Sequence, residues 1–401
     1  MAQRISCGID IGTARVKALI MAHGLPAMPA HAGQAGDPVP NILGCGSAET
    51  FGVRQGYIEH PEETAKAVRA AVAAAAKVAG VTPRRAVVGV CGIGLSSITA
   101  SGSIAVSRAD SEITALDAEK AEEASQNAIP SSFLQNKRVI YQTVLQYKID
   151  GKSIPSSPVG LKGAKLEARS FFVSCMGQHM ENLLEAVEAA DIAVERTVPS
   201  PLAASTVTLT RAQKVAGVVL ANIGSETVSI AVFENNIPIS LEVFPVGGGN
   251  VTNDIALGLR IPLEEAESVK RGAITGTTFP KKKLDEIIAA RLTDIFELIE
   301  AHLKKIGRSG LLPAGVVLTG GGSSLATIDD LAKAALRLPA RIANSLAVEN
   351  GKSQIKDASW SVAYGLANMG LLETGQSLSF GMESARRAKN TISEWFKQFL
   401  P

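Results

Sequence analysis

The stretch CGIDIGTARVKALI, residues 7–20, decides the fold. It predicts a β-strand, a turn that contains Gly12, and a second β-strand. The stretch GVVLANIGSETVSIAVF, residues 217–233, has the same order of elements, with Gly224 in the place of Gly12. Two such elements in one chain indicate a duplicated α/β domain whose halves face one another across a cleft.

A third glycine turn lies in GVVLTGGGSSLATIDDLAKAAL, residues 315–336, where a buried strand leads into three glycines and then a helix. Glycine has no Cβ, so the backbone N–H groups of such turns can approach phosphate oxygens closely. A single glycine in a hairpin is ordinary turn chemistry. Three glycine turns in this order favour a nucleotide site, in which residues 320–322 let a purine and its ribose lie flat against the backbone.

Side chains around the first turn extend this interpretation. Thr13 offers a hydroxyl donor to phosphate, and Lys17 or Arg15 offers a nearby cation. Asp10, at the end of the predicted strand, is placed to hold Mg²⁺ through water, because this ion binds hard oxygen ligands.

Alanine-rich helical stretches fill the chain between the turns. The predicted helices span residues 62–80, 117–127, 179–190, 262–272 and 284–306. The region 86–168 carries strands of its own, in AVVGVCG, SGSIAVS, RVIYQTVLQYKI and KLEARSFFVSC. It is therefore predicted to be a module inserted in the first half.

Composition restricts the class of protein. With 401 residues the chain is too long for one compact core, so two or more domains are expected. Lys and Arg number 40 against 38 acidic residues, so nucleic-acid binding is not predicted. The four cysteines form no CxxC pair and are expected to be reduced thiols of a cytosolic protein. The chain starts without a signal-peptide pattern and has no uncharged apolar run of about 18 residues, so we expect no membrane-spanning helix.

The last residues, NTISEWFKQFLP (390–401), concentrate aromatic side chains in a chain that is only 4% aromatic. At helical spacing they form one apolar stripe of Ile392, Trp395, Phe396, Phe399 and Leu400. The polar residues 372–382 predict a flexible tether, and residues 383–401 an amphipathic helix. Two roles stay open for this helix: it rests in a membrane interface, or it docks on its own domain.

Several further stretches resemble one family. They are SPVGLKGAKLEA (157–168), FPVGGGNVTNDIALGL (244–259), IPLEEAESVKRG (261–272) and VVLTGGGSSL (316–325). The order of the three turns is typical of the superfamily of actin, sugar kinases and heat-shock chaperone ATPases, and the chain resembles the bacterial cell-division actin FtsA over nearly its whole length. The resemblance implies an α/β, duplicated actin-like ATPase fold with two domains around a nucleotide cleft, an inserted α+β subdomain in the first half and a C-terminal amphipathic helix.

The resemblance also implies subdomain boundaries. The expected parts are a first actin-like subdomain (1–85 and 169–198), an inserted subdomain 1C (86–168), a second actin-like subdomain 2A (199–246 and 313–371), subdomain 2B (247–312), a linker (372–382) and the membrane-targeting helix (383–401).

A function in cell division is implied as well. Proteins of this family bind ATP or ADP with Mg²⁺, polymerise head to tail on the cytoplasmic face of the inner membrane, tether the FtsZ ring at the division site and recruit later divisome proteins. The tail would bury its apolar stripe in the bilayer interface while its basic residues meet anionic lipid. The membrane-contacting residues so implied are Arg386, Arg387, Lys389, Ile392, Trp395, Phe396, Lys397, Phe399 and Leu400.

The resemblance also implies binding positions in this chain. The nucleotide-binding set is Asp10, Gly12, Thr13, Ala14, Lys17, Asn222, Gly224, Ser225, Thr227, Gly248, Glu267, Lys270, Gly320, Gly321, Gly322 and Leu325, with Asp10 as metal ligand. Glu267 and Lys270 either hold the ribose or form an ordinary intrahelical ion pair. Arg291, assisted by Lys283, is the implied site for the acidic C-terminal peptide of FtsZ, and a solvated surface arginine is the alternative.

The second glycine turn departs from the family pattern D-I-G-G-G-T, because it is NIGSET (222–227). Asn222 removes a carboxylate from the expected Mg²⁺ shell, and Ser225 and Glu226 replace two glycines. We expect the Glu226 side chain to point into solvent, because two unit charges about 4 Å apart repel by about 4 kcal/mol at an effective dielectric near 20.

Catalysis finds little support in the sequence. Ser200 stands where related chaperones have a glutamate near the attacking water, so no general base and no catalytic residue is assigned. We expect nucleotide binding with at most weak ATPase activity. Two other functions stay open: a type IV pilus assembly actin, which lacks an amphipathic tail, and a sugar kinase or phosphatase of the superfamily, which needs carboxylates at both phosphate turns.

Overall fold

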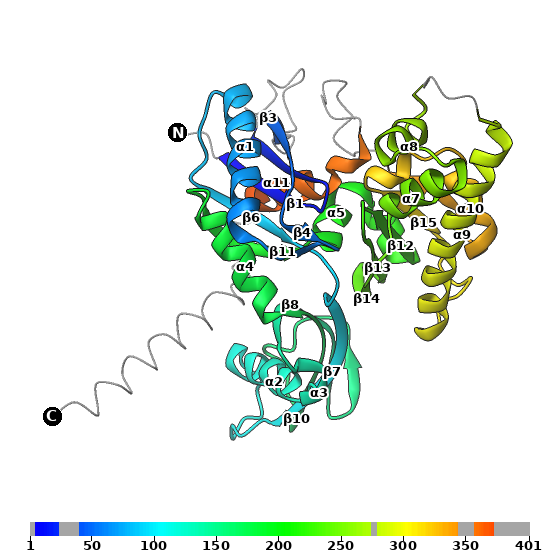
Figure 1. Cartoon of the computed structure of the whole chain (residues 1–401). Helices are drawn as coiled ribbons and strands as arrows, with labels where there is room; N and C mark the ends of the chain where they lie inside the picture. The colour runs from blue at the N-terminus through cyan, green and yellow to red at the C-terminus, as the bar shows by residue number, and fades with distance from the viewer. Residues whose placement is uncertain (1–4, 24–39, 274–278, 344–356, 373–401) are drawn as a thin grey trace, which may run out of the picture. The chain divides into compact units, whose positions relative to one another are not determined.

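The computed structural model describes residues 5–23, 40–273, 279–343 and 357–372. The chain forms two compact units, one made of the residues up to Leu95 and of Gln178–Leu371, the other containing Ser96–Gly177 (Figure 1). Within the described ranges, no helix combines the length and the hydropathy that spanning a bilayer requires.

The first sheet of the larger unit is built on the opening stretch of the sequence. β1 (Ile5–Ile11) and β2 (Arg15–His23) pair antiparallel around Gly12, which places Asp10 opposite Lys17. The strand order is β11-β6-β1-β2-β3. β3 (Pro40–Glu49) lies antiparallel to β2, whereas β6 (Arg85–Val90) and β11 (Ala193–Pro199) run parallel to β1 and to each other. A small hairpin of β4 (Val53–Arg54) and β5 (Tyr57–Ile58) follows β3.

Helices cover both faces of this sheet. α1 (Pro61–Ala79) packs where Gly44 and Gly46 of β3 leave room, and α11 (Ser361–Leu372) packs on the other face, against Gly8 of β1. α1 presents alanines to the sheet, so the two backbones approach closely. α4 (Gly177–Glu188) leads back into this unit from the inserted one.

Gly46→Val is expected to destabilise the larger unit by about 3 kcal/mol or more, because overpacking against backbone cannot be relieved by a rotamer change. A Cβ at Gly46 would collide with the carbonyl oxygen of Ala71 and the amide nitrogen of Ala75 in α1. Urea unfolding measures the effect. Ala70→Val on the exposed side of the same helix is the control, for which a change below about 0.7 kcal/mol is expected. Equal unfolding midpoints for the two variants would contradict this account of the packing.

The second sheet repeats the topology of the first. β12 (Val218–Ile223), β13 (Val228–Glu234) and β14 (Ile237–Phe244) form the antiparallel part, and β15 (Val316–Thr319) and β16 (Ala340–Ile342) continue it in parallel. The order β14-β13-β12-β15-β16 therefore matches β3-β2-β1-β6-β11 strand for strand. The predicted duplication is confirmed.

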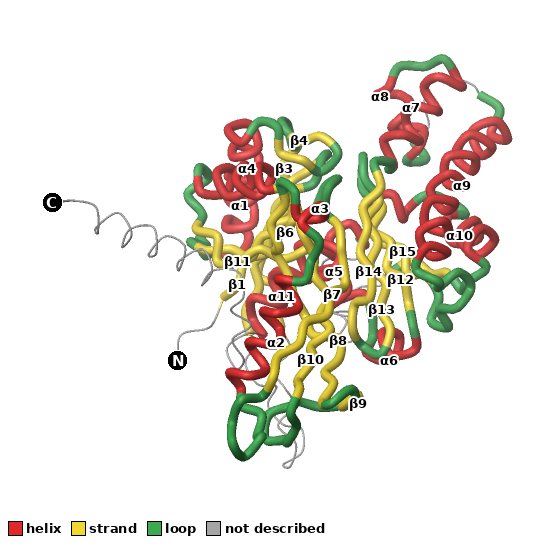
Figure 2. Tube along the Cα trace, turned by 90° about the horizontal axis from the view of Figure 1, so that it is seen from below, coloured by secondary structure: helices red, strands yellow, loops and turns green. Residues whose placement is uncertain are grey.

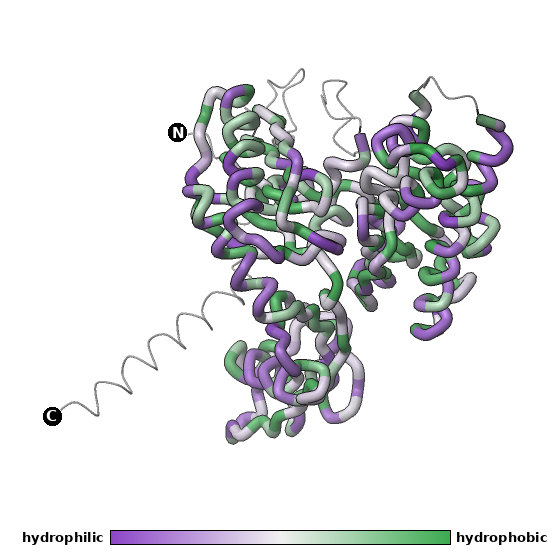
Figure 3. The backbone as a smooth tube through the Cα atoms, viewed as in Figure 1, coloured by the Kyte–Doolittle hydropathy of each residue, from purple (hydrophilic) through white to green (hydrophobic). Residues whose placement is uncertain are grey.

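The helices of this second half are α5 (Ser200–Thr208), α6 (Arg211–Ala216), α7 (Gly248–Leu259), α8 (Leu263–Lys270), α9 (Lys281–Lys305) and α10 (Ile328–Leu336), with short 3-10 turns η1 (Gly321–Ser324) and η3 (Ala358–Trp360). α9 carries both hydrophilic and hydrophobic residues along its length (Figure 3). Its buried residues include Leu292, Ile295, Phe296, Ile299 and Leu303, which recur at helical spacing and join the core of the half.

The inserted unit has one sheet of order β7-β10-β8-β9, whose strands lie side by side in Figure 2. Its strands are β7 (Ser96–Ala105), β8 (Lys137–Ile149), β9 (Lys152–Ile154) and β10 (Lys165–Met176), with helices α2 (Ala115–Asn127) and α3 (Ser131–Leu134). The predicted module limits, 86 and 168, fall inside β6 and β10. β6 pairs with β1 in the first sheet, and this long-range pairing is not visible in a local pattern.

Two buried histidines are held neutral by the larger unit. His179 of α4 accepts from the N–H of Ile58 at Nδ1 (3.3 Å) and contacts the carbonyl of Cys91 through Nε2 (2.9 Å). His302 of α9 bonds the Ser240 hydroxyl (2.7 Å). Burial lowers the pKa of each imidazole to about 4.

Acidification below about pH 6.5 is expected to destabilise this unit, because the unfolded histidines bind protons there while the folded ones stay neutral down to about pH 4. The stability they contribute is complete above pH 6.5, and each loses up to about 2 kcal/mol of it by pH 5. Urea unfolding at pH 7 and pH 5 measures the loss. Between pH 7 and pH 5 the His302→Gln variant should lose less unfolding free energy than the unaltered protein. An equal loss in both would show that protonation of His302 does not cause the destabilisation.

Candidate functional site

The first and second glycine turns contain the same hydrogen bond. The N–H of Gly12 donates to the carbonyl of Arg15 (3.2 Å), and the N–H of Gly224 donates to the carbonyl of Thr227 (2.8 Å). Each glycine N–H thus closes its own turn. A Cβ on Gly12 would lie 3.0 Å from the carbonyl oxygen of Arg15, and a Cβ on Gly224 would lie 3.0 Å from that of Thr227. The amides left to face a ligand are those of the two central residues of each turn.

The third glycine turn packs on the end of β12. Gly320 has φ +86, a left-handed backbone that disfavours other residues, and a Cβ there would meet the Asn222 side chain and the Ile223 carbonyl. A Cβ at Gly322 would meet the Ile223 side chain, whereas Gly321 has open space around it. The glycines therefore serve close packing as well as an open surface, and the Asn222 side chain lies beside the turn.

The N-terminus of α7 joins the second and third turns. The N–H groups of Gly248 and Gly249 donate to the carbonyls of Gly224 (2.8 Å) and Ser225 (2.6 Å). A Cβ at Gly248 would lie 3.8 Å from the Lys270 ammonium and 4.0 Å from the Cα of Gly322. Four residues of the predicted nucleotide site, namely Gly224, Gly248, Lys270 and Gly322, therefore meet at one place.

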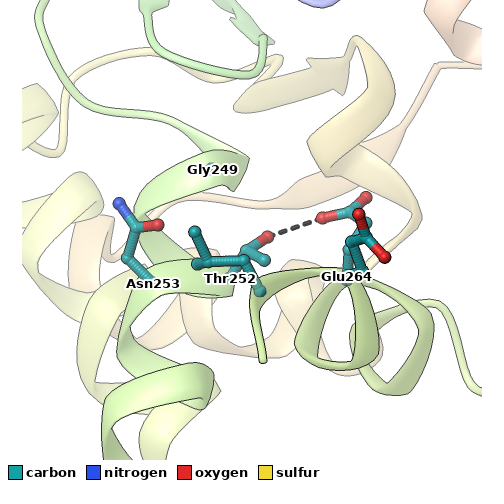
Figure 4. A pocket seen from close by; sticks show the side chains of 6 residues that line it. Gly249, Thr252, Asn253 and Glu264 are labelled. Atoms are coloured by element: carbon teal, nitrogen blue, oxygen red, sulfur yellow. Dashed lines mark hydrogen bonds between the residues drawn. The ribbon is translucent and has the colours of Figure 1, made fainter. Parts of the chain in front are cut away.

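An open pocket of about 470 Å³ lies beside this place, between α7 and α8. It is lined by Gly249, Thr252, Asn253, Leu263, Glu264 and Glu267. Figure 4 shows Thr252 on α7 and Glu264 on α8 at this pocket.

The predicted pair Glu267 and Lys270 forms an ion pair of 2.6 Å at the pocket. Thr252, which the sequence analysis did not single out, donates to Glu267 (2.6 Å) and accepts from Lys270 (2.8 Å). Burial by itself would raise the pKa of Glu267, but hydrogen bonds from Lys270, Thr252 and Arg271 lower it overall. Thr252 stands one helical turn after Gly248, which is the signal that could have indicated it.

η3 links β2, just after the first glycine turn, to the third glycine turn. The ammonium of Lys17 donates to the carbonyl of Ser359 (2.6 Å) and lies 5.6 Å from the centre of the Trp360 ring. The neighbouring carbonyl of Ala358 accepts from the N–H of Gly320 (3.4 Å). The Lys17 ammonium therefore already bonds η3, and a phosphate at this ammonium would compete with the Ser359 carbonyl for it.

Glu226 does not point into solvent as expected. Its carboxylate accepts a hydrogen bond from the backbone N–H of Gln55 (2.6 Å), in the turn between β4 and β5 of the first half. The next N–H, of Gly56, donates to the hydroxyl of Thr13 in the first glycine turn (3.0 Å). The prediction was wrong because the partner of Glu226 is far away in the sequence, and a hydrogen bond from a backbone N–H stabilises a carboxylate.

Asp10 is the carboxylate of the first turn. It keeps some accessible surface, yet protein groups surround its carboxyl, and burial raises its pKa to about 6 although Lys17 lowers it. The described residues contain no group of three or more His, Cys, Asp and Glu side chains arranged for a metal. Lys17 only partly offsets the effect of burial on the Asp10 carboxylate. A single carboxylate of this kind fits Mg²⁺, which is commonly held by one or two carboxylates, waters and substrate phosphates.

Two further predicted positions lie in the interior. Leu325 is 7% exposed and packs in the hydrophobic core of the second half. Ser200, at the start of α5, is 1% exposed, and its hydroxyl lies 2.7 Å from where a Cβ on Gly89 would be. Cys91 lies nearby, and burial raises the pKa of its thiol to about 12, so it is a thiol at neutral pH.

Arg291 is held by acidic neighbours. Its guanidinium donates to both carboxylate oxygens of Asp254 on α7 (2.6 and 3.0 Å) and lies 3.2 Å from Asp294. Lys283 is exposed in the first turn of α9. Asp254 was not singled out from the sequence, and Arg291 is an ion-paired residue with part of its surface exposed.

Comparison with known proteins decides the family. A family model described as "Cell division protein FtsA" matches residues 219–365, and one described as "SHS2 domain inserted in FTSA" matches residues 92–174. The cell division protein FtsA of Bacillus subtilis is 31% identical over 357 residues, which cover 84% of this chain and 78% of the relative. The chain belongs to the FtsA family of cell division proteins. The predicted family and its function in cell division are confirmed.

Other FtsA proteins match over greater lengths. FtsA of Pseudomonas aeruginosa is 28% identical over 420 residues, covering 98% of this chain and 96% of the relative, and FtsA of Escherichia coli K12 is 25% identical over 424 residues, covering 99% and 96%. Among solved structures, the PilM-PilN type IV pilus biogenesis complex matches with a TM-score of 0.65 and 18% identity over 91% of this chain and 98% of that one. This likeness shows the fold alone, an actin-like α/β fold of two halves. The family model shows the SHS2 domain inserted in it.

The predicted linker (372–382) begins at Leu372, which ends α11. The rest of the linker, the predicted helix (383–401) and all the residues implied in membrane contact lie outside the described residues.

Proposed function

We propose that this FtsA protein binds an adenine nucleotide with Mg²⁺ between the two halves of its larger unit, and that it assembles on the cytoplasmic face of the inner membrane. The observation that carries the nucleotide proposal is the ring of contacts among the three glycine turns. The first turn is linked to the second through Gln55 and to the third through η3, and the second meets the third at Gly248. Such a ring supports a site in which backbone amides from the turns would meet a phosphate ligand together.

The roles of the side chains follow from their positions. The amides of Thr13, Ala14 and Ser225 would receive phosphate oxygens, and Asp10 would hold Mg²⁺ through water. A bound Mg²⁺ would supply positive charge to the phosphates. Glu267 would accept from the ribose hydroxyls, since Lys270 and Thr252 keep its carboxylate oriented and ionised. Gly320 and Gly321 would lie against the adenosine.

Hydrolysis is proposed to be slow or absent. Asn222 cannot add a second carboxylate to the metal shell, and Ser200 is packed against β6, away from any role as general base. Turnover of radiolabelled ATP at rates typical of actin filaments would refute this part of the proposal.

Arg291 and Lys283 are proposed to receive the acidic C-terminal peptide of FtsZ. The peptide carboxylates would replace Asp254 on the Arg291 guanidinium, which already forms a bidentate contact with a carboxylate. The apolar stripe and basic residues of the tail are proposed to bind anionic lipid, and head-to-tail contacts between copies to build the filament. Subdomains 1C, 2A and 2B keep their proposed limits, 86–168, 199–246 with 313–371, and 247–312.

Electron microscopy on anionic lipid monolayers, with Mg²⁺ and ATP, tests the whole proposal. Filaments on the lipid are expected from the full chain, and none from a chain that ends at residue 382. Filaments on lipid from the shortened chain would remove the tail from the proposal, and failure of the full chain to bind nucleotide in solution would remove the site.

A further inference from the structure

Glu226 connects the two halves of the larger unit. It lies in the turn between β12 and β13, whereas its partner, the N–H of Gln55, lies in the turn between β4 and β5. The 2.6 Å bond from a backbone N–H to an ionised carboxylate is of the stronger, charge-assisted kind.

The Gln55 end of this bond is fixed on the first half. The carbonyl of Gln55 accepts from the N–H of Ile93 (3.1 Å), and the N–H of Gly56 donates to Thr13 (3.0 Å). A Cβ at Gly56 would lie 2.6 Å from the Cα of Gly92, so the turn is packed against its neighbour backbone to backbone. The N–H of Gln55 therefore holds a set position one residue from the contact with the first glycine turn.

The Glu226 end is equally fixed on the second half. Its turn is closed by the Gly224 to Thr227 hydrogen bond (2.8 Å), and the preceding carbonyl, of Ser225, accepts from the N–H of Gly249 at the start of α7 (2.6 Å). One side chain thus bridges two rigid backbones. Its carboxylate joins the second glycine turn to the β4–β5 turn, which in turn bonds Thr13 of the first glycine turn.

We propose that the Glu226 carboxylate occupies the place of a ligand's terminal phosphate, so that the site selects a nucleoside diphosphate over the triphosphate. Both groups are anions that accept backbone N–H groups, and both would lie between the same two turns. A triphosphate must displace the carboxylate from Gln55 and then face it at close range, whereas a diphosphate leaves the bond intact. The bond also holds the two halves together before any ligand binds. This inference rests on the proposed nucleotide site.

Calorimetric titration of the full chain with Mg²⁺-ADP and with Mg²⁺-ATP, without lipid, measures the selectivity. ADP is expected to bind at least about tenfold more tightly than ATP to the unaltered protein, because close like charges repel strongly. Glu226→Gln removes the charge and keeps an acceptor oxygen, and should bring the two affinities within about threefold, mainly by tightening ATP. Glu62→Gln, an exposed carboxylate in the first turn of α1, is the matched control and should keep the original ratio.

Hydrogen exchange at the Gln55 amide provides a readout that needs no nucleotide. Exchange should be slow in the unaltered protein and at least about tenfold faster in Glu226→Ala, which has no acceptor, as expected for loss of local protection. An ADP-to-ATP ratio that is the same in the unaltered protein and in Glu226→Gln would overturn the inference alone. Binding of neither nucleotide to any form would overturn the proposed function and the selectivity with it. Fast Gln55 exchange in the unaltered protein would overturn the bond itself.

Discussion

Trp395→Glu is expected to abolish binding of the full chain to anionic liposomes, with a fall in the partition constant of more than about tenfold. Burying one large apolar side chain contributes about 1.5–3 kcal/mol, and each 1.4 kcal/mol is a factor of about ten. The substitution removes that contribution from the middle of the predicted stripe and adds a charge that anionic lipid repels. Co-sedimentation with vesicles containing phosphatidylglycerol measures the effect.

Ser393→Glu adds the same charge on the predicted polar face of the tail and is the control. It should weaken binding far less, because the new carboxylate remains in water. Binding would be strengthened when the protein assembles, since linked anchors act through effective concentration, so the comparison should be made at a concentration without filaments. Equal losses in the two variants would show that charge, and not the apolar stripe, governs the attachment.

Asp10→Asn is expected to weaken Mg²⁺-dependent nucleotide binding by more than about tenfold, because the group that would hold the metal through water loses its negative charge. The same substitution should not destabilise the protein without ligand. Burial raises the pKa of Asp10 to about 6 from 3.8, so the ionised form costs stability at pH 7. The folded pKa lies above the unfolded one, so this cost grows as the pH rises from about 3.8 to about 6, and the neutral amide avoids about 1–3 kcal/mol of it.

Thermal unfolding with and without Mg²⁺-ADP separates the two effects. The Asn variant should unfold at or above the temperature of the unaltered protein when no ligand is present, and should gain little from Mg²⁺-ADP. Asp191→Asn, whose side chain is 90% exposed, is the control and should keep the full ligand shift. A variant that loses stability without ligand while still binding Mg²⁺-ADP would contradict both roles of Asp10.

The local sequence pattern was enough to predict the glycine turns of the site, whose form depends on backbone conformation. Residues 7–20 and 217–233 were predicted as two strands around a glycine turn, and both form the same hydrogen-bonded turn. The structure also places Asn222 beside the third glycine turn, because the parallel strands β12 and β15 end at the same edge of the sheet. These predictions rest on glycine placement and alternation, which are local properties.

Contacts between distant segments were not predictable in this way. Thr252, Asp254 and the bond of Glu226 to Gln55 were missed or misjudged, because each depends on which residue a fold places opposite. The pairing of β6 with β1, which assigns the strand at residue 86 to the first sheet, is a contact of the same long-range kind.

The sequence by itself determined the duplicated α/β fold, the FtsA family and the positions of the three glycine turns. Hydrophobic periodicity and the backbone freedom of glycine are local properties, which can be recognised from neighbouring residues. Only the tertiary structure decided which side chains meet. It placed the Glu226 carboxylate on a backbone amide of the other half, the Lys17 ammonium on η3, and Arg291 on Asp254. The physical reason is that the energy of a charged group depends on partners within a few ångströms, and these partners come from segments far apart in the chain.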